Sequence, residues 1–342
     1  MFKHLISLLL FPLILFSQEN VKFSKTIVIK DLQKHLNILA SDSLEGRETG
    51  KPGQKMAAEY IKNHFKKIGI PPYKGNKYYQ KFKVESDRHI CKYNCENCDE
   101  DFITKLFKKK RIVKGENILG YIEGTDLKQE LIIITAHYDH LGKHDTLLFN
   151  GADDNGSGTA AIMEIAEAFM IAKKQGYGPR RSVLIMPVSG EEKGLLGSKH
   201  YTENPIYPLE KTVANLNIDM IGRTDHYHDT SGYIYLIGSD MLSQELHDIS
   251  EMINKKHIGL ELDYTFNAED DPNRYYYRSD HYNFAKNNIP VIFYFNGIHD
   301  DYHKVTDTIE KIDFKKVEEI TRLVFLTAWE LANREERIKL KR

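Results

Sequence analysis

The fold class can be inferred from LIIITAHYDH, residues 131–140 of the chain. Its first six residues, Leu131 to Ala136, form a nearly continuous apolar run, which is typical of a buried strand with both faces covered. The turn GADDNGSG follows at residues 151–158, and residues 157–174 then carry apolar side chains at helical spacing. A buried strand, a glycine-rich turn and a helix in this order indicate an α/β fold.

The same alternation of strands and helices continues on both sides of this stretch. We expect helices over residues 32–70, interrupted by a loop at 41–47, and over residues 242–256 and 314–333. We expect further strands over residues 78–84, 182–188, 213–218, 233–237 and 291–295. This alternation favours a sheet that is covered by helices on both faces.

The chain is expected to begin with a removable segment. Lys3 precedes an apolar run from Leu5 to Phe16, and Ser17-Gln18-Glu19 is a plausible cleavage site. This pattern is typical of a secretory signal peptide over residues 1–17. A membrane anchor is the alternative, but the run is shorter than the roughly 20 residues that span a bilayer. We therefore predict a secreted or periplasmic protein whose mature part, residues 18–342, is one domain.

Charge and cysteine content limit the partners. The formal net charge is −1, which argues against a nucleic-acid partner, and no segment after residue 17 is apolar enough to cross a membrane.

Cys91, Cys95 and Cys98 lie in a polar segment at 85–114, which we interpret as a local excursion from the main fold because it is too short for a domain. Their spacing resembles an iron–sulfur motif, but in an exported chain one disulfide and one leftover thiol is the simpler interpretation.

Imidazoles and carboxylates follow the expected strands. They lie in the segments His137-Tyr138-Asp139, Asp153-Asp154, Glu191-Glu192, Asn217-Ile218-Asp219 and Asp301-Tyr302-His303. In open α/β sheets, functional groups gather outside the carboxyl ends of the strands, so we expect these side chains to meet at one rim. Two imidazoles and several carboxylates without a thiolate suit zinc, and also cobalt or manganese. The set is large enough for two ions about 3.5–4 Å apart, as in many hydrolases.

Two local patterns refine this prediction. The period of two in an extended segment places His137 and Asp139 on one side, where the Asp139 carboxylate can accept the other ring N–H of His137. The paired Glu191 and Glu192 allow one carboxylate to bind metal while the other accepts a proton from water. Taken alone, the glutamates could form an ordinary turn, and Asp153 could simply cap the following helix. The joint placement of all these groups favours a metal site.

The sequence resembles the zinc-dependent M28 peptidase family, whose bacterial members include secreted and periplasmic aminopeptidases. The resemblance runs from about Leu32 to the end of the chain. It is carried by LASDSLEGR (39–47), the segments around His137 and Asp154, SGEEKG (189–194), NIDMIGR (217–223), RSDH (278–281) and YHKVTDT (302–308). It implies a three-layer α/β/α sandwich of the zinc-exopeptidase type, with a central, mostly parallel mixed sheet.

The resemblance also implies an activity and a site. The activity is that of an aminopeptidase, with two Zn²⁺ per chain, acting on peptides with a free N-terminus. The implied metal ligands are His137, Asp154, Glu192, Asp219 and His303. Asp154 would bridge the two ions through a turn with a cis Asp154–Asn155 peptide bond; His137 and Asp219 would hold one ion, and Glu192 and His303 the other. Glu191 matches the general base, and Asp139 matches the residue that supports His137.

Two alternatives remain at this point. Glutaminyl cyclases look similar around His-Tyr-Asp and the glutamate pair, but they use one zinc ion and cyclise N-terminal glutamine. Their helix entrance departs from GADDNGSG and their pocket is rich in tryptophan, whereas this chain has one tryptophan, Trp329. A binding protein that keeps the fold without the chemistry is the second alternative, although such proteins lose ligands and all five are present here.

The substrate preference is not determined by these patterns. Residues 267–278 could form a wall beside the site or an ordinary exposed loop, and both interpretations stay open. Four further side chains could contact the substrate or support the site: Arg223, Arg278, Asp280 and His281.

Overall fold

The computed structural model describes residues 21–86 and 111–341 of the chain. The predicted signal peptide and the three cysteines lie outside these ranges. Within them, no helix combines the length and the apolar character that a membrane crossing requires.

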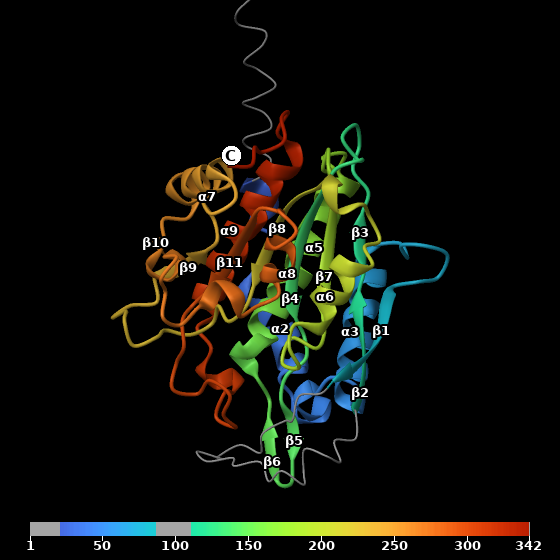
Figure 1. The fold of residues 1–342 in the computed structure, drawn as a ribbon, viewed down its shortest axis with the longest axis vertical. Helices are drawn as coiled ribbons and strands as arrows, with labels where there is room; N and C mark the ends of the chain where they lie inside the picture. Colours follow the sequence, from blue (N-terminus) through green and yellow to red (C-terminus); the bar gives the residue numbers. More distant parts are fainter. Residues whose placement is uncertain (1–20, 87–110, 342) are drawn as a thin grey trace, which may run out of the picture.

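The centre of the fold is a seven-stranded sheet with the strand order β10-β9-β11-β8-β4-β7-β3 (Figure 1). Its strands are β3 (Gly120–Ile122), β4 (Leu131–His137), β7 (Ser182–Val188), β8 (Thr212–Ile218), β9 (Tyr233–Ile237), β10 (Glu261–Asp263) and β11 (Val291–Phe295). The pairs β10/β9, β11/β8, β8/β4 and β4/β7 are parallel, whereas β11/β9 and β7/β3 are antiparallel. The predicted mostly parallel, mixed sheet is confirmed.

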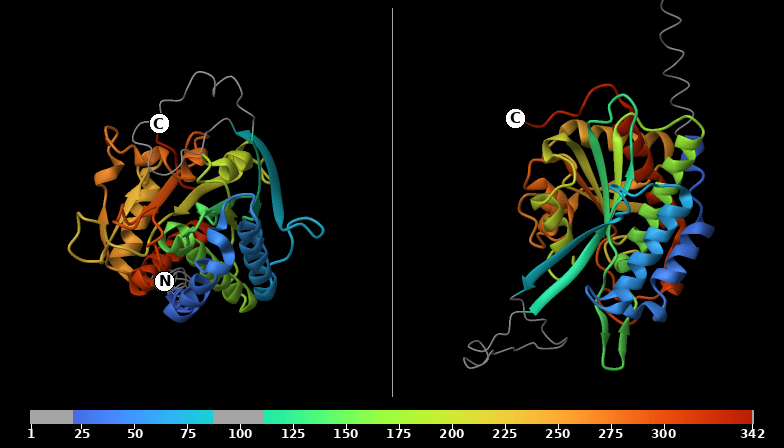
Figure 2. Two further views of the ribbon diagram at one scale, coloured as in Figure 1. Left: turned by 90° about the horizontal axis from the view of Figure 1, so that it is seen from below. Right: turned by 90° about the vertical axis from the view of Figure 1, so that its right-hand side faces the viewer.

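Helices cover both faces of this sheet. They are α2 (Ile29–Leu39), α3 (Pro52–Ile68), α5 (Gly158–Lys174), α6 (Leu196–Glu203), α7 (Gln244–His257), α8 (His281–Ala285) and α9 (Phe314–Asn333). Helices α2, α3, α5, α7 and α9 share one apolar core with the sheet, and α6 and α8 pack on the opposite face (Figures 1 and 2). The α/β/α sandwich predicted from the sequence is therefore present.

The central strand β4 shows why two helical layers form. All seven of its residues are buried. Ile132 and Ile134 contribute to the core under α5 and α9, whereas Leu131 and Ile133 contribute to the core on the opposite face. Because successive side chains of a strand point to opposite faces, a continuous apolar run needs cover on both sides.

Two antiparallel hairpins extend the fold beyond the sheet. Strands β1 (Tyr79–Ser86) and β2 (Arg111–Ile118) pair along their full lengths and project from the β3 edge (Figure 2). Strands β5 (Gly142–His144) and β6 (Leu147–Phe149) form a short hairpin between β4 and the GADDNGSG turn. The described parts of the predicted excursion, residues 85–86 and 111–114, are the paired ends of β1 and β2, so regular structure extends further into this segment than predicted.

Candidate active site

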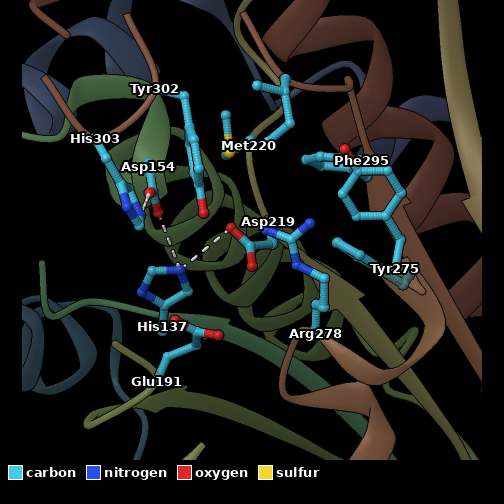
Figure 3. Close-up of a pocket in the computed structure, with 12 residues that line it drawn as sticks. His137, Asp154, Glu191, Asp219, Met220, Tyr275, Arg278, Phe295, Tyr302 and His303 are labelled. Carbon is cyan, nitrogen blue, oxygen red and sulfur yellow. Dashed lines mark hydrogen bonds and ion pairs between the residues drawn. The ribbon is translucent and has the colours of Figure 1, made fainter. Parts of the chain in front are cut away.

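The predicted residues meet outside the carboxyl ends of the sheet strands. Figure 3 shows His137, Asp154, Glu191, Asp219 and His303 among them. His137 ends β4, Asp219 directly follows β8, and Asp154 lies in the turn Ala152–Ser157 ahead of α5. The loop after β7 carries Glu191 and Glu192, and the loop after β11 carries His303. The parallel neighbours β7, β4, β8 and β11 end at the same edge of the sheet, and this explains why residues distant in sequence converge.

The first group of possible metal ligands consists of His137, Asp154 and Asp219, all of them buried. Nε2 of His137 lies 3.3 Å from Oδ1 of Asp154 and 3.2 Å from Oδ1 of Asp219. Ser279 donates a hydrogen bond to the other oxygen of Asp219 at 2.6 Å, which fixes the orientation of that carboxylate. Three ligand atoms of these residues are close enough to one another to hold one ion.

A second group lies on the other side of Asp154. Nε2 of His303 is 3.0 Å from Oδ2 of Asp154 and 3.5 Å from Oε2 of Glu192. The two oxygens of Asp154 therefore face two different histidines, His137 through Oδ1 and His303 through Oδ2. This is the arrangement that a carboxylate bridging two ions requires.

The Asp154 turn is held by its own neighbours. The Asp154–Asn155 peptide bond is cis, as the resemblance implies. The carboxylate of Asp307 accepts hydrogen bonds from the backbone N–H groups of Asp153 and Asp154 at 3.0 and 3.1 Å. The Asn155 side chain donates to the carbonyl of Ile218 at 2.8 Å, so the turn is tied to the end of β8.

Arg47, the last residue of the LASDSLEGR motif, joins two of the site loops. Its guanidinium is buried and donates hydrogen bonds of 2.5–2.9 Å to the backbone carbonyls of Leu39, Tyr138, Asn150 and Gly151. Burial lowers the pKa of Arg47 to about 10, partly offset by the nearby Asp154 carboxylate, so the group is still cationic at neutral pH. Arg47 thus connects the segment after β4 to the loop that enters the Asp154 turn.

Asp139 supports the site differently from the prediction. Nδ1 of His137 lies 3.0 Å from the backbone carbonyl oxygen of Asp139, whereas the carboxylate oxygen is 3.9 Å away. The carboxylate instead accepts hydrogen bonds from the Thr49 hydroxyl at 2.5 Å and from the backbone N–H of Glu191 at 3.3 Å. The main chain, rather than the side chain, therefore provides the acceptor for His137, and the side chain anchors the Glu191 loop.

The surroundings of Glu191 and Glu192 shift the pKa values of these two carboxylates in opposite directions. Burial raises the pKa of Glu191 well above its usual range, with His137 opposing the shift and the charge of Glu192 adding to it. Against burial and the charge of Asp154, contacts with His140 and His303 lower the pKa of Glu192 to about 2. Two carboxylates whose pKa values are pushed apart suit different roles, a proton carrier and a permanently ionised ligand.

A pocket opens beside His137 and Glu191. Its outer wall is largely apolar and is formed by Met220, Tyr275, Phe293, Phe295, Ile298 and Tyr302. Arg278 is the cation on this wall; it lies over the Tyr275 ring at 4.8 Å and points into the space beside Asp219 (Figure 3). Of the segment 267–278, Tyr275 and Arg278 line the pocket, which supports its interpretation as a wall at its C-terminal end.

The other three side chains whose role was left open lie outside the pocket lining and support the site: Arg223, Asp280 and His281. Arg223 pairs with Asp301 at 2.8 Å. Asp280 accepts a hydrogen bond from Ser198 at 2.5 Å, and His281 is buried and stacks on Phe293.

From the sequence, no role was assigned to His140, and Arg47 and Asp307 were quoted only as parts of motifs. His140 stands three residues after His137 and its Nδ1 is 2.9 Å from Oε1 of Glu192. It belongs to the same LIIITAHYDH stretch, but a period-two pattern cannot place a side chain that lies beyond the strand end. Asp307 contacts the Asp154 turn across more than 150 positions of sequence, a contact that no local pattern indicates.

The comparisons agree with this geometry. A model of peptidase family M28 matches residues 117–328, which include every predicted metal ligand. The chain belongs to peptidase family M28. Among curated relatives, a probable leucine aminopeptidase of Trichophyton verrucosum is 30% identical over 290 residues, covering 82% of this chain and 74% of its own.

Two solved structures illustrate the range of this fold. BSAP, a zinc aminopeptidase from Bacillus subtilis, aligns with a TM-score of 0.68 at 17% identity, covering 92% of this chain and 98% of its own. A glutaminyl cyclase from Porphyromonas gingivalis aligns with a TM-score of 0.64 at 17% identity, covering 88% and 97%. At such low identities the likeness concerns the fold, so the M28 fold alone does not separate a peptidase from a cyclase.

Proposed function

We propose that this M28 protein is a two-zinc aminopeptidase that uses Glu191 as the general base. The observation that carries the proposal is the position of Asp154, whose two oxygens face two histidines in two separate ligand groups. A single-ion enzyme needs only one such group. The donor set, which consists of imidazole and carboxylate groups, suits zinc.

Charge in the site supports bound metal cations. The carboxylates of Asp154, Glu192 and Asp219 would carry three negative charges in a largely buried site when ionised. An unpaired buried charge is strongly unfavourable, and divalent ions would compensate these charges. His137 and Asp219 would hold one ion, Glu192 and His303 the other, and Asp154 both.

Zinc in such a site acidifies bound water and polarises a carbonyl group. The residues of the chain carry out the proton transfer. Glu191 accepts the proton of the attacking water and delivers it to the leaving amine, which would otherwise depart as a very poor anion. The raised pKa of Glu191 suits a group that must hold a proton between these two events. The apolar wall formed by Met220, Phe293 and their neighbours would receive the side chain of the N-terminal residue.

The acidic rim implies a requirement for a free amine. A substrate with a terminal ammonium group carries a positive charge that complements the site carboxylates. Acetylating the N-terminus of a good peptide substrate should lower kcat/KM by about 100-fold or more, since hydrogen bonds to charged groups contribute about 1.5–3 kcal/mol each. A peptide amidated at its C-terminus is the matched control and should be cleaved at the normal rate. Equal cleavage of acetylated and free peptides would instead indicate an endopeptidase.

Glutaminyl cyclisation is the second candidate, favoured by the structural likeness to the Porphyromonas gingivalis cyclase. The presence of both ligand groups and the tyrosine- and phenylalanine-lined pocket support the peptidase. We further propose that the protein is exported, on the strength of the signal-peptide pattern in residues 1–17.

A further inference from the structure

His140 is a buried histidine at the second ligand group. It follows β4, and its side chain is fully shielded from solvent. Its Nδ1 lies 2.9 Å from Oε1 of Glu192 and 3.7 Å from Oδ2 of Asp154. Together with these two carboxylates it forms a compact set of ligand atoms able to hold an ion.

The polar atoms of this contact lack ordinary hydrogen bonds. Within the described part of the chain, neither ring nitrogen of His140 has a hydrogen-bond partner, and the same is true of Oε1 of Glu192. The atoms Nδ1 and Oε1 are close, but they are not aligned as donor and acceptor. Buried polar atoms are normally satisfied, so an unaligned close pair indicates that both atoms point toward a third partner.

The fold makes room for this ring. Gly151 has a left-handed backbone with φ of +55°, and a Cβ atom there would lie 2.4 Å from Cδ2 of His140. His303 approaches the same carboxylates edge to face, with the two imidazole centroids 5.9 Å apart. The two histidines thus flank Glu192 and Asp154.

The separations match those of atoms that share one ion. With zinc–nitrogen and zinc–oxygen bonds of about 2.0–2.2 Å, two ligands at angles of about 90–120° lie roughly 3.0–3.7 Å apart. The contacts of His140 with Glu192 and Asp154 span 2.9–3.7 Å, and those of His303 with the same residues span 3.0–3.5 Å.

We propose that His140 is a sixth metal ligand, which binds through Nδ1 the ion held by Asp154, Glu192 and His303. This inference rests on the proposed metal-dependent function. It gives the second ion two imidazoles, whereas the first has His137 alone. Imidazole favours zinc over manganese or magnesium, so the second ion should be the more strongly selected of the two.

The test is a zinc titration of metal-free protein in competition with a chromogenic chelator, for wild type, His140→Leu and His140→Asn. Loss of a residue that only orients a ligand costs about 10–100-fold in metal affinity, so loss of a ligand should cost more than about 100-fold. We expect both variants to bind one of the two zinc ions more than about 100-fold more weakly than the wild type and to bind the other with unchanged affinity. Cobalt-loaded protein should lose the same ligand, seen as a changed visible absorption spectrum.

His144→Leu is the matched control, because His144 lies nearby in the β5–β6 hairpin and contacts the carbonyl of Leu141 at 3.0 Å. It should bind zinc as the wild type does. Thermal unfolding of the metal-free proteins establishes which variants are folded. If His140→Leu does not fold, the more polar His140→Asn is used as the test variant.

Two results would overturn the assignment. Wild-type zinc affinity in a folded His140 variant excludes a metal-binding role, and rescue by asparagine alone shows that His140 only donates a hydrogen bond to Glu192. A wild-type chain that binds one ion would contradict the two-zinc proposal separately, and the effect of His140→Leu on that ion would still decide the role of His140.

Discussion

Replacing Glu191 by glutamine should lower kcat by about 10²–10⁴-fold, the usual contribution of general acid–base catalysis, while both zinc ions are retained. Glutamine keeps the size and much of the hydrogen bonding of the side chain but cannot accept the proton of the attacking water. The effect should appear in kcat at saturating peptide, with KM little changed, and zinc content is measured on the same preparation.

Glu192→Gln is the matched control because it makes the same chemical change one residue away. Glu192 faces His303 and has a pKa held at about 2, as expected of an ionised ligand. Replacing Glu192 should weaken the binding of one of the two zinc ions, and activity should recover in part at high zinc concentration. If Glu191→Gln lost zinc and Glu192→Gln kept it, the two roles would be reversed.

Replacing Arg47 by methionine should destabilise the protein by at least about 3–5 kcal/mol, since it leaves several buried acceptors without a donor, each costing about 1–3 kcal/mol. That is a large part of a typical folding free energy of about 5–15 kcal/mol. Four backbone carbonyls around the site depend on this guanidinium. Arg47→Lys should rescue little, because an ammonium group cannot reproduce the planar fork of donors.

Urea unfolding of metal-free protein measures this effect without a contribution from zinc binding. Arg180→Met is the control: Arg180 also makes bidentate contacts, but with the exposed Asp126 carboxylate at the surface. Exposed ion pairs contribute about 0–1 kcal/mol, so this variant should unfold close to the wild type. An Arg47→Met protein as stable as Arg180→Met would show that the carbonyls find other donors.

The elements of the fold with strong apolar patterns were predictable from the sequence. Strand β7 and helix α9 have the predicted bounds, 182–188 and 314–333. The first is apolar over nearly its whole length, and the second carries apolar residues at helical spacing. Elements with weak patterns were not predicted: α6 has the sequence LGSKHYTE and β2 the sequence RIVKGENI, in which polar residues interrupt any period. Their structure depends on tertiary contacts, with α8 and β1 respectively.

The site likewise contains residues that were predictable from the sequence and residues that were not. Residues directly at strand ends, such as His137 and Asp219, follow from the rule that functional groups gather at the carboxyl edge. His140 and the carboxylate of Asp139 lie where the chain has left the strand, so the direction of these side chains depends on loop conformation. The Asp139 carboxylate therefore points to Thr49 rather than to His137. The pocket wall combines Met220, which follows β8, with strand β11 and with Tyr275 and Arg278, and only the folded chain brings these segments together.

The number of zinc ions in the active enzyme distinguishes a two-zinc aminopeptidase from a single-zinc cyclase. Metal-free protein is titrated with zinc while hydrolysis of a leucine chromogenic substrate and cyclisation of an N-terminal glutamine peptide are followed in parallel. We predict two equivalents bound per chain, full hydrolytic activity with both in place, and no cyclisation. Saturation at one equivalent, with cyclisation of glutamine and no release of leucine, would show that the protein is not a two-zinc aminopeptidase.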